Sequence, residues 1–285
     1  MKLQNIFYAR HRDLIFLSNP KCGCTTIKNS LSISDIPEGE DIHSSANAAG
    51  LTFPPHLDVP IFAVTRNPYS RILSCFLDKF NFQGDAGGER KKRYFNQLGF
   101  DAPQKISFLT FLQRVRELPT LETANAHYRP QVFNLYKDDI QPQFIGRLEE
   151  MGEVASFLSK HRVELKTRRH HATGSSETYK DLISKEEASI IQDIYQDDFD
   201  TFGYSTDLLS DFVPPASYRT QRVSERLQIV VKAKGMGLWA KDLKLISENR
   251  EAKNPIQAKH FQAAAALLRK QVALKKSPAK GSLKV

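Results

Sequence analysis

The feature that most constrains the fold is a short apolar run that passes directly into a small-residue turn and a helical pattern. Residues 13–18 (DLIFLS) have the continuous apolar centre expected of a parallel strand buried on both faces. The turn 19–23 (NPKCG) follows, and Ile27 and Leu31 then recur at helical spacing. A strand, a tight turn and a helix in this order predict an α/β fold.

The same alternation continues along the chain. Further buried strands are predicted at 61–65 (IFAVT) and 144–146 (FIG), whereas 34–58 is predicted to be an irregular connection and 84–93 (GDAGGERKKR) a polar loop. Helical spacing and capping residues predict helices over 67–80, 106–115, 148–158 and 185–202. We therefore predict a three-layer, P-loop-like α/β fold with a mainly parallel central sheet flanked by helices.

The charge is distributed unevenly between a body and a tail. The 285 residues carry a net charge of +9, but residues 216–285 hold 16 Lys and Arg against 4 Asp and Glu. The first 215 residues hold 25 against 28, so the basic character is no argument that the body binds nucleic acid. We place the body at 1–206 and a basic, partly helical extension at 207–285.

Apolar residues in the extension predict helices at about 218–232 and 255–275 that pack against the body or a second subunit. Their basic faces are expected to attract a polyanionic acceptor or an anionic membrane surface. The alternative is a solvated extension that aids solubility. The sequence does not predict the oligomeric state.

The sequence lacks the patterns of a membrane span, a signal peptide and a cysteine framework, and these bear on the compartment and on metal binding. No window reaches the roughly 18 apolar residues that span a membrane, and the N-terminus does not resemble a signal peptide. Cys22, Cys24 and Cys75 form neither a disulfide framework nor a zinc quartet. We expect a cytoplasmic protein without a metal.

The turn at 19–23 has the composition of an anion-binding loop. The N-terminus of a helix presents backbone N–H groups and a positive dipole end to an anion. Gly23 permits close approach, Lys21 adds a charge, and Thr25 and Thr26 add hydroxyl donors. The lysine precedes the glycine, unlike the G-x-x-x-x-G-K-[ST] loop of ATP-binding proteins. On these residues alone, an ordinary turn remains the alternative.

A second candidate element begins at the next strand. Arg66 follows 61–65, at the carboxyl end of a strand, where open α/β sheets bind ligands. Ser74 lies eight residues on, on the predicted polar face of the helix. The alternatives are a surface arginine and a solvated serine. Two anion-binding elements on two strand ends predict a ligand with two separate phosphate groups.

These elements resemble those of a known family. PKCGCTT and VTRNPYSRILSCFLDKF are similar to the nucleotide-binding elements of sulfotransferases that use 3′-phosphoadenosine-5′-phosphosulfate (PAPS), nearest to the carbohydrate, chondroitin-type group. Lys21 matches the lysine of the family's 5′-phosphosulfate loop. Arg66, Pro68, Arg71 and Ser74 match its R-x-P-x-x-R-x-x-S element, which holds the 3′-phosphate.

The resemblance extends over residues 13–206. The segment 127–158 is similar to the family's H-W-x-P-Q region and the strand and helix after it, and 184–205 to its closing helix. Tyr128 and Arg147 depart from the usual tryptophan and lysine. The family's Golgi members have an N-terminal membrane anchor that is not found here, which points to a bacterial-type cytoplasmic enzyme.

The resemblance implies transfer of a sulfuryl group from PAPS to an acceptor hydroxyl, on a glycan or glycolipid. It implies that Lys21 stabilises the leaving phosphate and that Arg66 and Ser74 hold the 3′-phosphate. Thr173 and Ser175 would lie in a small polar segment near the cofactor. The remaining residues expected to bind the 5′-phosphate are Cys22, Gly23, Cys24, Thr25 and Thr26.

Sulfuryl transfer also needs a base for the acceptor hydroxyl. His43 lies between the two cofactor elements and resembles the histidine of an H-x-S-A-N segment in chondroitin-type enzymes, so it is the first candidate. His56, His127 and a carboxylate remain alternatives.

Two other functions compete with this one. A P-loop-like kinase is disfavoured because no G-K-[ST] follows the glycine. A sulfotransferase-like binding protein, whose basic tail engages nucleic acid or an anionic lipid, is the second alternative.

Overall fold

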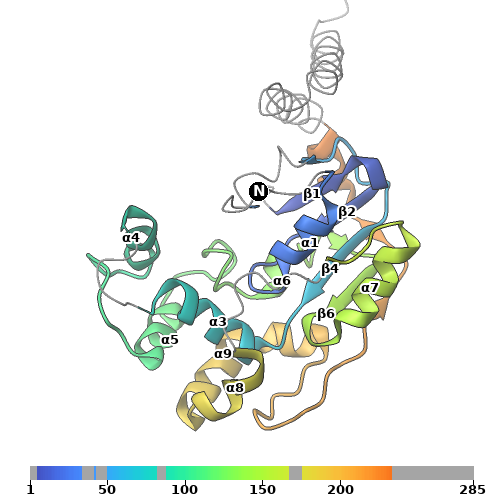
Figure 1. Ribbon diagram of the computed structural model, residues 1–285. Coiled ribbons are helices and arrows are strands. Elements are labelled where there is room, and N and C mark those ends of the chain that lie inside the picture. The colour runs from blue at the N-terminus through green and yellow to red at the C-terminus, as the bar shows by residue number, and fades with distance from the viewer. Residues whose placement is uncertain (1–4, 34–41, 43–49, 82–87, 167–174, 233–285) are drawn as a thin grey trace, which may run out of the picture.

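The computed structural model of the chain describes residues 5–33, 42, 50–81, 88–166 and 175–232 (Figure 1). Within that part, a six-stranded sheet forms the centre, with strand order β3-β1-β2-β4-β6-β7. Its strands are β1 (Ile6–Ala9), β2 (Leu14–Leu17), β3 (Leu51–Thr52), β4 (Ile61–Thr65), β6 (Phe144–Arg147) and β7 (Ser217–Tyr218).

The middle of the sheet is parallel and its edges are antiparallel. Strand β4 pairs in parallel with β2 on one side and β6 on the other. Strand β1 is antiparallel to both β2 and β3, and β7 is antiparallel to β6. A two-stranded sheet pairs β5 (Ile140–Gln141) with β8 (Arg222–Val223). The predicted α/β fold with a mainly parallel central sheet is confirmed.

Helices cover both faces of this sheet, because alternate side chains of each strand point to opposite sides. Phe16, Phe62 and Phe144 pack with α1 and α7, and the Phe144 and Phe157 rings stack with centroids 4.3 Å apart. Ile15, Ala63 and Ile145 belong to the core on the other face, with α3, α5 and α9. The helices are α1 (Cys24–Leu31), α3 (Pro68–Lys79), α4 (Gly88–Gln97), α5 (Phe108–Arg116), α6 (Gln131–Asn134), α7 (Met151–Lys160), α8 (Ser175–Leu182) and α9 (Lys185–Phe202), with 3-10 turns η1 (Arg10–Arg12) and η2 (Leu148–Glu150).

The polar loop predicted at 84–93 is wrong from residue 88 onward, where α4 begins. The helix is held by apolar residues that lie beyond the predicted loop. Phe95 is fully buried, and its ring lies 5.2 Å from that of Phe80. The polar composition of 88–93 reflects an amphipathic helix, not a loop.

The described part of the extension packs against the body. The helix expected over 218–232 is wrong for its first residues, because 217–218 and 222–223 are strands and helix begins only at 225. Backbone hydrogen bonds to the body hold that segment extended, from Arg219 N to Gln143 O at 3.0 Å among them. Leu227 and Val231 are fully buried in the core. The second expected helix, 255–275, lies outside the described residues, and the 206/207 boundary stays a prediction.

No helix in the part of the chain that the structure describes is long and apolar enough to cross a membrane.

Candidate functional site

The carboxyl ends of the three parallel strands β2, β4 and β6 meet at one edge of the sheet. Strand β2 leads into the turn before α1, and β4 leads into Arg66 and Asn67. Glu149 follows β6; its Oε1 accepts a hydrogen bond from Asn67 N at 2.8 Å, and its Oε2 accepts one from the Tyr204 hydroxyl at 3.1 Å. Ligands of open α/β sheets bind outside this edge.

The turn after β2 is shaped by two residues in the left-handed region of backbone space. Lys21 has φ 69° and Gly23 has φ 73°. A Cβ atom on Gly23 would meet only the end of the flexible Leu148 side chain, so the position favours glycine for its left-handed conformation. Gly23 is the N-cap of α1, so the positive dipole end of that helix faces the turn. This geometry suits an anion.

A fully buried glutamine, Gln131, ties the turn to β4. Its Oε1 accepts hydrogen bonds from Asn19 Nδ2 at 2.9 Å, Cys22 Sγ at 3.2 Å and Arg66 N at 3.0 Å. Its Nε2 donates to Arg66 O at 2.8 Å. Asn134 Nδ2 adds a bond to Asn19 Oδ1 at 3.0 Å. The oxygen and the nitrogen of the Gln131 amide are thus both hydrogen-bonded, and their partners lie on the turn after β2 and on the residue after β4. These bonds fix the position of the two loops relative to each other.

The buried carboxylate of Asp198 is hydrogen-bonded to the backbone at Gln131. Asp198 on α9 accepts hydrogen bonds from Gln131 N at 2.8 Å and Val132 N at 2.9 Å, the first two N–H groups of α6. Burial raises the pKa of Asp198 to about 6, although the Arg71 charge and these N–H donors act in the opposite direction. Asp198 thus serves as the N-terminal partner that α6 needs.

Arg71 is only 1% exposed and donates to three backbone carbonyls. Its Nε bonds to Pro20 O at 3.2 Å, Nη1 to Arg129 O at 3.0 Å and Nη2 to Ala126 O at 3.0 Å. It therefore ties α3 to the turn and to the segment before α6.

Arg66 is also buried, at 4% exposure. Its Nε donates to Ser70 Oγ at 2.9 Å and its Nη1 to Lys21 O at 3.2 Å. Ser74 is 2% exposed, so a surface arginine and a solvated serine are both excluded. The helix face expected to be polar turns toward the β2 turn. We call the interconnected residues in and beneath that turn the polar hub: Asn19, Cys22, Arg66, Arg71, Gln131, Asn134 and Asp198.

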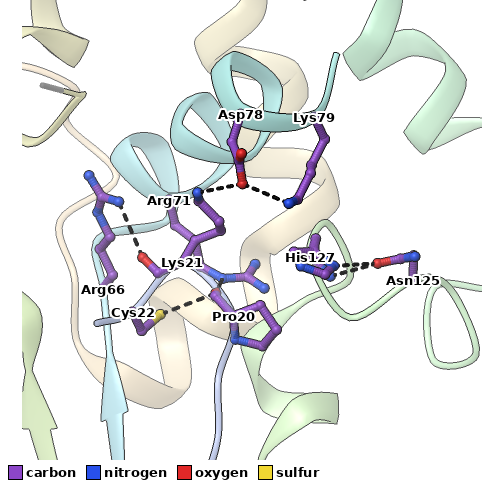
Figure 2. A network of polar contacts seen from close by, with 9 residues as sticks. All are labelled: Pro20, Lys21, Cys22, Arg66, Arg71, Asp78, Lys79, Asn125 and His127. Carbon is purple, nitrogen blue, oxygen red and sulfur yellow. Dashed lines mark hydrogen bonds and ion pairs between the residues drawn. The ribbon is translucent and has the colours of Figure 1, made fainter. Parts of the chain in front are cut away.

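Above the turn lies a partly buried group of charges, which we call the Lys21 cluster: Lys21, Asp78 and Lys79. Both lysine Nζ atoms lie 3.0 Å from Asp78 Oδ2 (Figure 2). Burial alone would raise the pKa of Asp78, but the two ammonium groups outweigh it and hold that pKa below its usual value. The side chains of Lys21 and Asp78 are 12% and 34% exposed.

His127 lies beside this cluster, on the side of Lys21 away from Arg66 in Figure 2. Its Nδ1 lies 2.8 Å from Asn125 Oδ1, which also accepts from His127 N at 3.0 Å. Its ring stands edge-on to Tyr94, with centroids 5.4 Å apart. Burial, together with the positive charges of Lys79, Lys21 and Arg71, lowers the pKa of His127 to about 3.

The comparison with protein families matches this region. The model of the Sulfotransferase family covers residues 4–205, which include both strand-end elements and α9. The chain belongs to the sulfotransferase family. No curated protein and no solved structure matches it. The family match makes the protein a transferase enzyme of the sulfuryl-transferring class.

The structure brings several residues predicted for this sulfotransferase to the same edge of the sheet. Lys21 and Gly23 form the turn, Cys24 to Thr26 begin α1, and Arg66 and Ser74 lie on the neighbouring element. Whether these residues bind a nucleotide stays a prediction.

Other predicted residues are not placed at the site. His43 and Thr173 lie outside the described residues, and Ser175 begins α8 without a described side chain. His56 is 47% exposed in its side chain, lies 3.9 Å from Asp58, and precedes β4 instead of following it. Of the three candidate histidines, the structure places His127 beside Lys21.

Three residues of the site, Asp78, Gln131 and Asp198, are not among those predicted from the sequence. Asp78 is four residues after Ser74 on α3, so helical spacing could have found it. Gln131 stands within the segment that resembles the family's H-W-x-P-Q region. The role of Asp198 depends on packing between α9 and α6, which leaves no local signal.

Cys22, Cys24 and Cys75 are buried free thiols. Burial raises the pKa of Cys22 and Cys75 to about 12, so neither is a thiolate at neutral pH. In the described ranges, no group of three His, Cys, Asp or Glu side chains could hold a metal ion.

Proposed function

We propose that this sulfotransferase moves a sulfuryl group from PAPS to an acceptor hydroxyl. The observation that carries the proposal is the pairing of two elements at neighbouring strand ends. The Lys21 turn follows β2, the Arg66 element follows β4, and the two strands pair in parallel. PAPS carries a 5′-phosphosulfate and a separate 3′-phosphate, so it needs two anion sites.

The turn fits the 5′-phosphosulfate. Gly23 has no side chain, and it lies at the N-cap of α1, where the positive dipole end of the helix faces the turn. Thr25 and Thr26 lie in the first turn of α1 and can add hydroxyl donors. Cys22 and Cys24 are the small side chains that the turn accommodates.

Lys21 is the residue that we assign to the leaving phosphate. Sulfuryl transfer resembles phosphoryl transfer, in which a loose, in-line transition state needs positioning and charge stabilisation more than covalent chemistry. The ammonium of Lys21 is bound to Asp78, so its binding to a phosphate requires exchange of one anion for another.

Arg66 and Ser74 are the residues that we assign to the 3′-phosphate. A charged, buried guanidinium at a strand end attracts an anion strongly because little water screens it. The 3′-phosphate is absent from ATP, so this element would distinguish the two nucleotides. Thr173 and Ser175 stay proposed as polar residues near the cofactor.

The acceptor that we propose is a hydroxyl of a glycan or glycolipid, in a cytoplasmic, bacterial-type enzyme. The support is the resemblance to chondroitin-type sulfotransferases. The excess of Lys and Arg in residues 216–285 favours an anionic polymer or membrane surface near the tail. His43 is the base that the resemblance implies, and His127 is the one that the described geometry favours.

The test is transfer of labelled sulfate from PAPS to a panel of extracted glycans and lipids. We expect a sulfated product from the wild type, inhibition by 3′-phosphoadenosine 5′-phosphate (PAP), and no phosphate transfer from labelled ATP. Phosphate transfer from ATP would favour a kinase, and PAP binding without sulfate transfer to any acceptor would favour the binding-protein alternative.

The tail is tested by truncation after residue 232, because Leu227 and Val231 belong to the core. We expect activity on a small neutral acceptor to survive. The apparent KM for an acidic polymer should rise and lose its salt dependence. Unchanged kinetics on the polymer would leave the tail without a substrate role.

A further inference from the structure

The acceptor hydroxyl must approach the sulfur from the side opposite the leaving phosphate, because sulfuryl transfer is in-line. Arg66 and His127 lie on opposite sides of Lys21 in Figure 2. With the donor nucleotide extending toward Arg66, the acceptor arrives on the side of His127. On the basis of the proposed function, we infer that His127 is the catalytic base that takes the proton of the acceptor hydroxyl, with Asn125 as its positioning residue.

The hydrogen bonds of Asn125 determine which ring nitrogen carries the proton. Asn125 Nδ2 donates to Gln97 Oε1 at 2.8 Å, so the amide oxygen of Asn125 faces His127. The Tyr128 hydroxyl also donates to Gln97 Oε1, at 3.4 Å, which keeps that oxygen an acceptor. Asn125 Oδ1 can only accept, so His127 Nδ1 must carry the hydrogen in the contact of 2.8 Å.

The neutral ring therefore has its lone pair on Nε2. Among the described residues, no hydrogen bond to His127 Nε2 is found, and the ring is held by Asn125 on one side and Tyr94 on its edge. A fixed tautomer with a lone pair that no described residue occupies is what a general base requires.

The surrounding charges keep this ring neutral before the reaction. The groups that face it are Lys21 on the turn, Arg71, Asp78 and Lys79 on α3, and Tyr94 on α4. Burial and the three cations lower the pKa of the ring to about 3, whereas Asp78 raises it. The phosphates of a bound donor would offset the same cations, and the pKa of His127 would rise. The base thus becomes stronger when the donor is in place.

The acceptor oxygen forms a bond to sulfur, and the bond from sulfur to the 5′-phosphate oxygen breaks with its electron pair, so that PAP leaves. The hydroxyl proton moves to His127 Nε2. The imidazolium that results keeps its Nδ1–H on Asn125, and its extra proton passes to water after PAP and the product are released.

The first test compares His127→Gln with His43→Gln and the control His11→Gln, an exposed histidine in η1. Transfer is measured with labelled PAPS and the glycan and lipid panel, and PAP binding by calorimetry. We expect His127→Gln to lose roughly 10²- to 10⁴-fold in kcat with PAP affinity unchanged, and the control His11→Gln to keep wild-type kcat. A loss of that size in His43→Gln, with wild-type kcat in His127→Gln, would assign the base to His43. Wild-type kcat in His127→Gln, or loss of PAP binding with kcat, would overturn the inference. If the wild type transfers no sulfate, the proposed function fails, and this inference with it.

A second test does not depend on activity. In ¹⁵N histidine spectra of the wild type at neutral pH, His127 should be the Nδ1–H tautomer, and its pKa should rise when PAP is added. An Nε2–H tautomer, or a pKa that PAP does not change, would overturn the inference. In Asn125→Asp the added carboxylate should move the acidic limb of the kcat–pH profile to higher pH. A purely structural role for Asn125 would leave that limb in place.

Discussion

Lys21 joins the polar hub to the Lys21 cluster, and the two regions differ in how far their polar groups are shielded from water. The carbonyl of Lys21 accepts from Arg66 in the hub, whereas its ammonium binds Asp78. Gln131 and Asp198 in the hub are fully buried. The side chain of Asp78 is 34% exposed, so its ion pair with Lys21 is open to water. The hub fixes the geometry of the site, and the cluster supplies a charge that can change partner.

The energies of the two regions follow from this difference. A buried carbonyl left without its donor costs about 1–3 kcal/mol, so the hub resists rearrangement. The ion pair of Lys21 and Asp78 is partly buried, but its carboxylate reaches water, so after solvent screening it contributes on the order of 1 kcal/mol. Exchange of Asp78 for a phosphate oxygen at Lys21 is therefore accessible on binding. Variants of the hub should chiefly change stability, apart from those of Arg66, which we also assign to the 3′-phosphate. Variants of the cluster should change turnover or PAP affinity.

The largest effect is expected from Arg71→Met in the hub. It removes the donor to three carbonyls at once, Pro20 O, Ala126 O and Arg129 O. The free energy of unfolding, measured in urea, should fall by about 3–5 kcal/mol. Arg114→Met, which breaks a half-exposed pair with Glu117, is the control and should change it by less than about 1 kcal/mol. Equal effects of the two variants would show that the hub is not a stability element.

Lys21→Ala in the cluster should lower turnover, with little effect on stability. We expect kcat to fall by roughly 10²- to 10³-fold, because charge develops on the leaving phosphate in the transition state. PAP affinity should fall much less, and the free energy of unfolding should stay close to that of the wild type. Steady-state kinetics and calorimetry separate these quantities, with Lys160→Ala on α7 as the control. A loss confined to PAP affinity would contradict the assignment of Lys21 to the leaving group.

Asp198 tests the hub through pH. Burial raises its pKa to about 6, so the folded state binds a proton more tightly than the unfolded state does. Its contribution to stability is full below about pH 4 and is lost as pH rises through about 6. The difference in unfolding free energy between wild type and Asp198→Asn should therefore decrease over that range, by at most about 3 kcal/mol. The exposed neighbour variant Asp197→Asn should keep the wild-type slope, and a matching slope in Asp198→Asn would contradict the account.

The smallest effect is expected from Asp78→Asn. It removes the carboxylate that competes with the ligand for Lys21. PAP should bind up to about fivefold more tightly, the equivalent of about 1 kcal/mol. Calorimetry at low salt measures this most clearly, because salt screens the pair. Weaker PAP binding in Asp78→Asn would mean that Asp78 positions Lys21 for the ligand.

The sequence predicts the parts of this site that are local in the chain. The buried strands and the residues directly after them, Lys21 and Arg66, are visible as short patterns, and the parallel order brings them together. The hub is not predictable in this way. Gln131 lies 65 residues from Arg66, and Asp198 lies 67 residues from Gln131. Their hydrogen bonds arise only when three separate elements pack.

The missed elements of the fold have similar causes. Strands β3 and β7 contain two residues each, too few for an alternation to be recognised. The helix α4 has a polar first half, and its anchor, Phe95, follows that half. The extension looked separate by charge, yet Leu227 and Val231 fill the core. Composition describes the charged surface of the extension well. It does not show which few apolar residues pack the extension against the body.

The central claim is that two strand-end elements bind two separate phosphate groups, with Arg66 on the 3′-phosphate. The most direct measurement is calorimetric titration of the wild type and Arg66→Ala with PAP and with adenosine 5′-phosphate, which lacks the 3′-phosphate. We predict that the wild type binds PAP more tightly by about 1.5–3 kcal/mol, and that Arg66→Ala removes most of this difference. Equal binding of the two nucleotides by the wild type, or a preference that persists undiminished in Arg66→Ala, would contradict the account.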